Sequence, residues 1–337
     1  YGADQAYTFT EFSAQLLGLL KDRDQLYWAY GRMPSWDEPI LSAINKLRGK
    51  VRGGIVAPAS LLNPETLIHA QRLRKSPAEI AIMQKANDIT AEGHRLAMRA
   101  CRPGKYEYEL QAALTQHFLQ QGSLSYAYPP IIGSGANSCV LHYGDNNCKI
   151  KDGDLVLIDA GAEYENYAAD VTRSFPANGK FSYEQAAIYD LVLEAQKAAI
   201  ATIQPGLPWP ALQKSIVQIL TTGLVELGLL KGRVEDLIAE KKYLKFYMHN
   251  SGHWLGMDTH DVGAYRQGKD WRCLEAGIVL TVEPGIYIAA GTPEVDERWW
   301  NIGVRIEDDI LVTPEGHLNL TRDLPKERSE IEALMRS

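Results

Sequence analysis

The chain has 337 residues, 45% of them hydrophobic and 23% charged, as in an ordinary globular protein. A net charge of -7 and a pI of about 5.7 argue against nucleic acid or an anionic membrane as the main partner. No apolar run approaches the roughly 20 residues that a membrane span needs. The length exceeds that of a usual single domain, so we expect two.

Residues 1–70 alternate between helical and extended patterns. The apolar spacing predicts helices over 9–20 and 38–47, and strands over 25–30 and 53–59. These elements would form an α/β segment too small to bury a large core alone. We therefore expect a small N-terminal domain over 1–70 and a larger second domain over 71–337.

The second domain begins with a long helix that has a clear start signal. Ser76 is the expected N-cap, Pro77 the first helical residue and Glu79 the partner of a capping box. Ser182 and Gln185 form the same signal for a later helix. The sequence predicts further helices over 106–122 and 210–228, and strands over 155–161, 167–175, 278–288 and 303–313. Paired helices alternating with such strands indicate an α+β domain with an antiparallel sheet covered by helices.

The cysteines are too few to form a disulfide framework in a chain of this length. They are Cys101, Cys139, Cys148 and Cys273, and no two of them make a C-x-x-C pair. We interpret them as free thiols of a protein in a reducing cytoplasm.

Two aspartates occupy the apolar hairpin "LIDAGAEYENYAADVTRSF". If the turn is Glu165–Asn166, Asp159 and Asp170 lie one diagonal step apart on the same face. A three-residue turn would place them on opposite faces. Because a bare carboxylate is costly to bury, two of them in one hairpin call for a compensating charge.

Two glutamates occur in similar surroundings. Glu283 ends an apolar strand in "TVEPG", and Glu307 follows one in "GVRIEDD". Arg305 would share the face of Glu307 on a strand and could hold a ligand carboxylate in place. The alternative is that Glu307 joins Asp308 and Asp309 in a solvated acidic patch.

Three histidines cluster in "HNSGHWLGMDTH", namely His249, His253 and His260. The glycines around His253 favour a loop over a helical His-x-x-x-His pair. A fourth, His142, follows what reads as a short apolar strand in "SCVLHYG". Each histidine or aspartate alone is more often a core, turn or cap residue, and we interpret Asp258 and Asp261 as ordinary loop acids.

The combination of four acids in apolar strands with a histidine cluster indicates a metal centre. Four uncompensated buried carboxylates would repel one another, and some would have to take up protons. Two divalent cations and a bridging hydroxide nearly neutralise them. Oxygen donors with one imidazole and no thiolate favour Mn²⁺ over a structural Zn²⁺ site. Such a metal pair can activate water and polarise a carbonyl.

The order Asp, Asp, His, Glu, Glu resembles that of the dinuclear metallopeptidases of pita-bread fold. The phrases "GSGANSCVLHYGDN", "DGDLVLIDAGAEY", "HWLGMDTHDVG", "LTVEPGIYI" and "GVRIEDDILVT" are similar to those of the bacterial Xaa-Pro aminopeptidases, also called aminopeptidase P. The likeness runs from about Leu67 to the end of the chain. Residues 1–66 resemble only the later part of that family's N-terminal domain.

The resemblance implies a set of ligands and a reaction. Asp159 and Asp170 would bind one metal, while Asp170, His253, Glu283 and Glu307 would bind the other, with Asp170 and Glu307 bridging. His142, His249 and His260 would contact the substrate. The family cleaves the bond between an N-terminal residue and a following proline, and its members often form dimers or tetramers.

The expected mechanism uses a hydroxide that bridges the two metals and attacks the scissile carbonyl. His249 or His260 would stabilise the carbonyl oxygen, and Glu283 would carry a proton to the leaving proline nitrogen. We expect Tyr287 to line the pocket and Arg305 to support a ligand. A prolidase limited to Xaa-Pro dipeptides is the nearest alternative. A methionine aminopeptidase, a metal-free amidinohydrolase and a non-catalytic binding protein of the same fold fit less well.

Overall fold

The structure is a computed structural model, and it describes residues 2–336. The chain divides into two compact units, Tyr1–Gln71 and Arg72–Ser337. Within residues 2–336, no helix combines the length and the apolar character needed to cross a membrane.

The N-terminal unit pairs two short parallel strands with helices. Its elements are α1 (Phe12–Leu20), β1 (Gln25–Tyr27), α2 (Pro34–Arg48) and β2 (Ser60–Leu62). Leu16, Leu20, Ile40 and Leu47 form the centre of its small core.

The strand predicted over 53–59 is wrong. A 3₁₀ turn over Val51–Gly53 is followed by Gly54 with φ of +78°, and the strand begins only at Ser60. Pro58 lacks the N–H that a strand ladder requires, so the apolar run before it stays unpaired. A further helix, α3 (Glu65–Leu73), begins in this unit and ends two residues beyond it.

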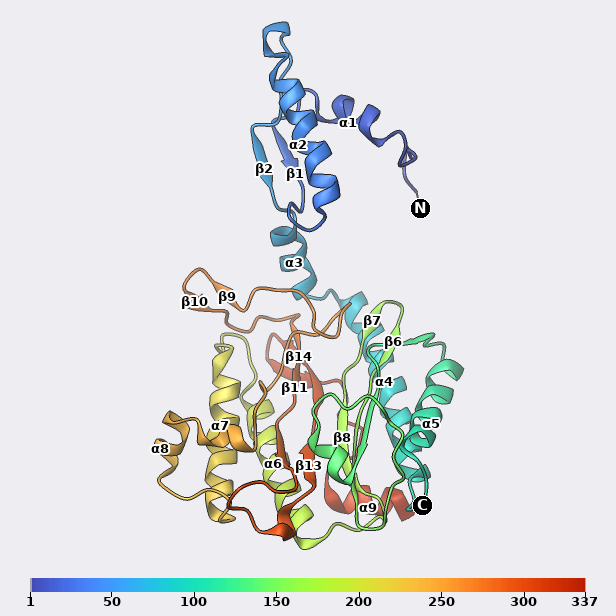
Figure 1. Cartoon of the computed structure of the whole chain (residues 1–337), viewed down its shortest axis with the longest axis vertical. Coiled ribbons are helices and arrows are strands. Elements are labelled where there is room, and N and C mark those ends of the chain that lie inside the picture. Colours follow the sequence, from blue (N-terminus) through green and yellow to red (C-terminus); the bar gives the residue numbers. More distant parts are fainter. Residues whose placement is uncertain (1, 337) are drawn as a thin grey trace. The chain divides into compact units, whose positions relative to one another are not determined.

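The helices of the C-terminal unit confirm the predicted start signals. Ser76 accepts a hydrogen bond from the backbone of Glu79, and Ser182 does the same for Gln185, in complete capping boxes. In Figure 1, α4 and α5 lie along one side of the strands, and α6 and α7 along the other. The helices of this unit are α4 (Pro77–Ala100), α5 (Glu107–Gln120), α6 (Tyr183–Thr202), α7 (Pro210–Glu226), α8 (Val234–Ala239) and α9 (Arg328–Arg336).

The strands of this unit pair antiparallel in several small sheets, which confirms the α+β prediction. Two three-stranded sheets, β4-β5-β8 and β11-β14-β15, and the pair β12-β13 surround the candidate site described below. The strands are β3 (Ser125–Tyr126), β4 (Ile131–Ser134), β5 (Leu155–Asp159), β6 (Ala162–Tyr164), β7 (Tyr167–Ala168), β8 (Thr172–Pro176), β9 (Arg266–Gln267), β10 (Asp270–Trp271), β11 (Val279–Val282), β12 (Gly285–Ile288), β13 (Ile302–Arg305), β14 (Asp308–Thr313) and β15 (Gly316–Asn319). Apolar side chains from β4, β5, β6, β8 and β11 to β14, together with those of α4 to α7, form the main core.

The two-residue hairpin turn is confirmed. Tyr164 pairs with Tyr167, and Glu165 and Asn166 between them have φ of +46° and +68°, as a tight hairpin turn requires. The same register continues into β5 and β8, where Asp159 pairs with Thr172. Asp170 precedes Thr172 by two residues and is therefore the diagonal neighbour of Asp159, as predicted.

Three strands that we predicted as continuous are interrupted. The breaks fall at Ala169–Val171, Glu283–Pro284 and Ile306–Glu307, between β7 and β8, β11 and β12, and β13 and β14. Each break contains one predicted acidic ligand. Outside a ladder, a side chain is not bound to the two-residue alternation of a strand, so the breaks at Glu283–Pro284 and Ile306–Glu307 can direct their acids independently. Around Asp170 the hairpin register continues through backbone hydrogen bonds.

A close backbone approach accompanies the first break. A Cβ on Gly161 would lie 1.7 Å from the carbonyl oxygen of Ala169, so only glycine fits there. On either side, the Ala160 amide donates to Val171 and the Ala169 amide donates to Ala162, both at 3.0 Å. The strand expected just before His142 is also wrong, because Gly135–Cys139 forms a 3₁₀ helix that leads into a turn.

Candidate metal centre

The structure brings the predicted acids and one histidine together. Ligand atoms of Asp170, His253 and Glu307 all lie within 4.8 Å of one another. His253 Nε2 lies 3.3 Å from Asp170 Oδ2 and 3.6 Å from Glu283 Oε1. Asp170 and Glu307 are buried, whereas the His253 and Glu283 side chains retain 15% and 17% exposure.

Burial and mutual repulsion disfavour the charged forms of the clustered carboxylates. Burial and the neighbouring carboxylates raise the pKa of Asp170 and of Glu307, and burial raises that of Glu283 to about 7. Burial alone would lower the pKa of His253, but its hydrogen bond to Asp170 and the nearby carboxylates raise it to about 9. Without metal the site therefore holds extra protons, and divalent cations fit the places of those protons.

Tyr128 joins the two hairpin aspartates, and sequence reasoning missed it. Its hydroxyl lies 2.5 Å from Asp159 Oδ1 and 2.6 Å from Asp170 Oδ1. One hydroxyl proton cannot serve two carboxylates at once, so this oxygen cluster also favours an added cation. No feature of "SYAYPPIIG" singled out this tyrosine, because its partners lie more than 30 residues away.

Arg305 supports a predicted ligand, but the partner is Asp159 rather than its neighbour Glu307. The buried guanidinium donates to Asp159 Oδ2 at 2.6 Å and to the Tyr287 hydroxyl at 2.8 Å. Glu307 instead accepts a hydrogen bond of 2.6 Å from the Thr172 hydroxyl. The strand ends at Arg305, so the face that it was expected to share with Glu307 does not continue.

The solvated acidic patch is wrong, because Asp308 and Asp309 are completely buried. Burial would raise the pKa of Asp308, but Arg173 and Lys326 hold it well below its usual range. Arg173 also donates to the carbonyl oxygen of Glu307 at 2.6 Å, which fixes the backbone of that ligand.

Asp309 contacts the backbone of Asp170, one of the predicted ligands. Its Oδ2 accepts a hydrogen bond from the Asp170 amide at 3.0 Å, while its Oδ1 has no partner among the described residues. Burial and the nearby Asp170 carboxylate raise the pKa of Asp309 well above its usual range. A protonated Asp309 can hold the Asp170 backbone without adding charge to the cluster.

The remaining predicted histidines border the cluster. His253 and His260 have ring centroids 4.4 Å apart, on a loop as predicted. His249 Nε2 lies 2.9 Å from the Tyr287 hydroxyl, and burial and Arg305 lower the pKa of His249 to about 4. His142 is exposed, and it acts electrostatically on both His249 and His260.

Asp261 is not an ordinary loop acid. Its buried carboxylate lies 3.1 Å from Lys75 Nζ, itself buried, and 2.5 Å from Arg72 Nη2. Asp258 is an exposed partner of Arg72, closer to the expected role. The buried pair holds the residue next to His260 against the segment just before α4, and no local pattern predicts this contact across 186 positions.

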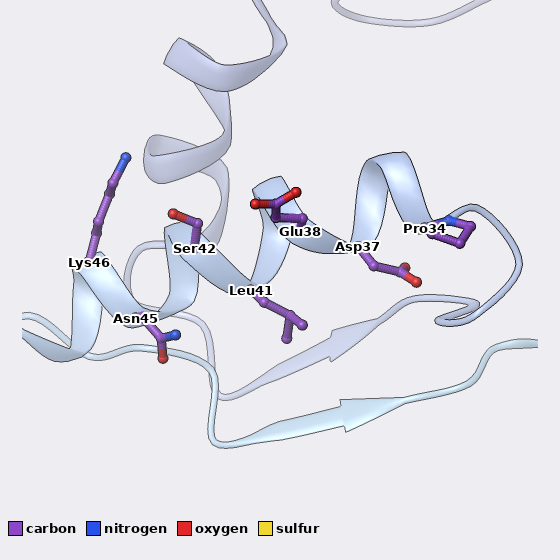
Figure 2. A pocket seen from close by; sticks show the side chains of 7 residues that line it. All are labelled: Pro34, Asp37, Glu38, Leu41, Ser42, Asn45 and Lys46. Atoms are coloured by element: carbon purple, nitrogen blue, oxygen red, sulfur yellow. The ribbon is translucent and has the colours of Figure 1, made fainter.

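A hollow of about 760 Å³ lies in the N-terminal unit, and its lining residues fall between positions 34 and 46. Figure 2 shows that all seven lining residues come from α2, with Leu41 beside polar side chains. It contains none of the predicted site residues, so the chemistry belongs to the C-terminal unit.

Comparisons with known proteins agree with this geometry. The model of metallopeptidase family M24 matches residues 81–314. The chain is 47% identical to the Xaa-Pro aminopeptidase of Escherichia coli over 334 residues, covering 99% of this chain and 75% of that protein. It is 44% identical to the Haemophilus influenzae Xaa-Pro aminopeptidase, covering 98% and 74%.

Solved structures show the same likeness. The aminopeptidase PepP of Pseudomonas aeruginosa superimposes with a TM-score of 0.95 at 50% identity, covering 100% of this chain and 76% of that one. A zinc-substituted E. coli aminopeptidase P in complex with product gives 0.94 at 47% identity, covering 99% and 76%.

Proposed function

Because this chain belongs to metallopeptidase family M24, we propose that it is a metal-dependent aminopeptidase cleaving the bond between an N-terminal residue and a following proline. The observation that carries this proposal is the buried cluster of Asp170, His253 and Glu307, within a chain that matches Xaa-Pro aminopeptidases over nearly its whole length. The C-terminal unit has the pita-bread fold of this family.

The proposed ligands are the five residues that the sequence indicated. Asp159 and Asp170 would hold one ion, and Asp170, His253, Glu283 and Glu307 the second, with Asp170 and Glu307 shared. The donor set is rich in oxygen and has no thiolate, which supports Mn²⁺. When bound, such a pair lowers the pKa of water, supplying a hydroxide nucleophile, and polarises the scissile carbonyl.

The protein's own residues would orient the substrate and move the proton. The backbone carbonyl oxygen of Asn250 lies 2.8 Å from His249 Nδ1, so Nδ1 donates there and Nε2 accepts from the Tyr287 hydroxyl. Among the described residues, no hydrogen bond holds the ring nitrogens of His260. His260 is therefore better placed than His249 to donate to the carbonyl oxygen of the substrate.

Glu283 is the proposed proton shuttle. Its side chain keeps 17% exposure at the edge of the cluster, so a proton can reach its carboxylate and leave from it. The leaving nitrogen of proline belongs to an amide without N–H, and its pocket needs no acceptor for that hydrogen.

Activity and metal content together test the proposal. The protein is freed of metal with a chelator, reloaded with Mn²⁺ or Zn²⁺, and assayed on Xaa-Pro-Xaa, Xaa-Ala-Xaa and Xaa-Pro peptides. We expect about two ions per chain and cleavage of the Xaa-Pro-Xaa tripeptide. Cleavage of the dipeptide alone would identify a prolidase, and neither metal nor hydrolysis would favour a binding protein.

Three further proposals concern organisation. Residues 1–70 would be the later part of a small α/β domain, and 71–337 the catalytic domain. A cytoplasmic location is supported by the four free cysteines, of which Cys148 and Cys273 are exposed. A homo-oligomer, a dimer or tetramer, is testable by light scattering of the full chain.

A further inference from the structure

Glu107, the first residue of α5, has a fully buried carboxylate with an unusual set of partners. Five donors surround it, and among the described residues none of its hydrogen-bond partners is a cation. Oε1 accepts from the Ser134 amide and hydroxyl, both at 2.7 Å, and from Asn137 Nδ2 at 3.1 Å. Oε2 accepts from the Tyr143 hydroxyl at 2.8 Å and from the Cys148 amide at 2.9 Å.

All five donors belong to one segment, residues 134–148, which we name the His142 segment. They come from its beginning, its middle and its end. Hydrogen bonds to a charged group contribute more than neutral ones, and a buried carboxylate depends on them for its solvation. Beyond Ser134, the last residue of β4, the segment has one short 3₁₀ helix, so its shape depends on side-chain contacts. Glu107 supplies five of them, and Asn146 adds hydrogen bonds to Ile132 and Pro130.

The His142 segment reaches the candidate site through Tyr143. Its hydroxyl is held by Glu107, and its ring packs in a cluster with Leu157 and Tyr287. The Tyr287 hydroxyl in turn contacts His249 and Arg305. A second attachment joins the Ser138 hydroxyl to the Gly303 amide of β13 at 3.0 Å.

We propose that Glu107 is a positioning residue, which fixes the His142 segment so that the neighbouring His142 is presented to the substrate. This inference rests on the proposed function, because His142 matters only if a peptide binds beside it. Glu107 does not touch the acidic cluster, so its effect should pass through His142 and leave the metals in place.

The test is a double-mutant cycle between Glu107→Gln and His142→Ala. Glutamine keeps the shape of the side chain, but its NH₂ group replaces one carboxylate oxygen. That NH₂ would face either the donors of Ser134 and Asn137 or those of Tyr143 and Cys148, and it cannot accept their hydrogen bonds. We expect kcat/KM for an Xaa-Pro-Xaa peptide to fall by about 10- to 100-fold, the range that misplaced groups cost. In the His142→Ala background the same change should cost less than about threefold, because the route is already broken.

Two readouts separate positioning from general damage. Metal content should stay at the wild-type value, and hydrogen exchange of the Ser134 and Cys148 amides should quicken. Glu109→Gln is the matched control, since it makes the same chemical change two residues further along α5. Glu109 is half-buried and forms an ion pair with Lys105. Tyr143→Phe removes one donor only and serves if Glu107→Gln does not fold.

The inference is overturned if the fold losses of kcat/KM in Glu107→Gln and His142→Ala multiply in the double mutant. It is also overturned if Glu107→Gln loses metal together with activity, or if His142→Ala has no effect while the wild type cleaves the peptide. A wild type that cleaves no Xaa-Pro peptide refutes the proposed function instead. In that case, unchanged hydrogen exchange of the Ser134 and Cys148 amides in Glu107→Gln would overturn the role of Glu107 as well. Faster exchange of these amides would support the view that Glu107 fixes the His142 segment.

Discussion

Replacing Gly161 with alanine should separate the two aspartates of the hairpin. The new Cβ would lie 1.7 Å from the Ala169 carbonyl oxygen, whereas ordinary contacts begin at 3.4 Å. No side-chain rotation relieves a clash between Cβ and backbone, so the two segments must move apart by about 1.7 Å. That movement carries Asp170 away from Asp159.

The expected cost follows from this overlap. Overpacking of this kind destabilises by about 3 kcal/mol, and the melting temperature falls by about 2–4 °C per kcal/mol in large domains. We expect a fall of about 6–12 °C and a loss of activity of about 100-fold, because catalytic groups misplaced by about 1 Å cost that much.

Thermal melting with and without Mn²⁺, metal analysis and peptide hydrolysis measure these effects. Gly144→Ala is the control, because a Cβ there meets no atom within 4 Å and its melting temperature should not change. A Gly161→Ala protein that melts within about 1 °C of the wild type, with full metal content, would refute this account of how the hairpin sets the site.

Three other substitutions have defined outcomes. Asp170→Ala should remove metal and abolish activity, since it would serve both ions; full turnover in that variant excludes the shared role. Arg305→Ala leaves the Asp159 carboxylate without its 2.6 Å partner, so a metal titration should show weaker binding with some activity left. Burial lowers the pKa of His94 to about 4, below its unfolded value. The unfolded state therefore binds more protons between pH 6.5 and pH 4, and stability falls as the pH falls through that range. His94 should account for about 2 kcal/mol of the stability lost between pH 7 and pH 5. Urea unfolding of His94→Gln at both pH values should show a smaller loss, and an equal loss would contradict this.

Local chemistry explains what the sequence predicted well. The capping boxes at Ser76 and Ser182 depend on residues three positions apart, and the hairpin register depends on a turn of two residues. Such short-range rules act before tertiary packing and survive it. The register alone was enough to place Asp170 diagonal to Asp159.

Long-range contacts explain what the sequence could not show. Tyr128, Arg173 and Glu107 look ordinary in their own surroundings, and their roles come from partners 27 to 135 residues away. The same is true of Asp308, whose burial depends on Arg173 and Lys326. The strand predicted over 53–59 is wrong for the opposite reason, because the local effects of Gly53, Gly54 and Pro58 outweigh the apolar run.

The interruptions at Ala169–Val171, Glu283–Pro284 and Ile306–Glu307 keep three of the five proposed ligands outside the assigned strands, whereas Asp159 ends β5. A substitution at Asp170, Glu283 or Glu307 alters the chemistry without shifting the register of any neighbouring strand. The fold can therefore support a different reaction after substitution of these side chains alone, because the pairing of its strands does not change.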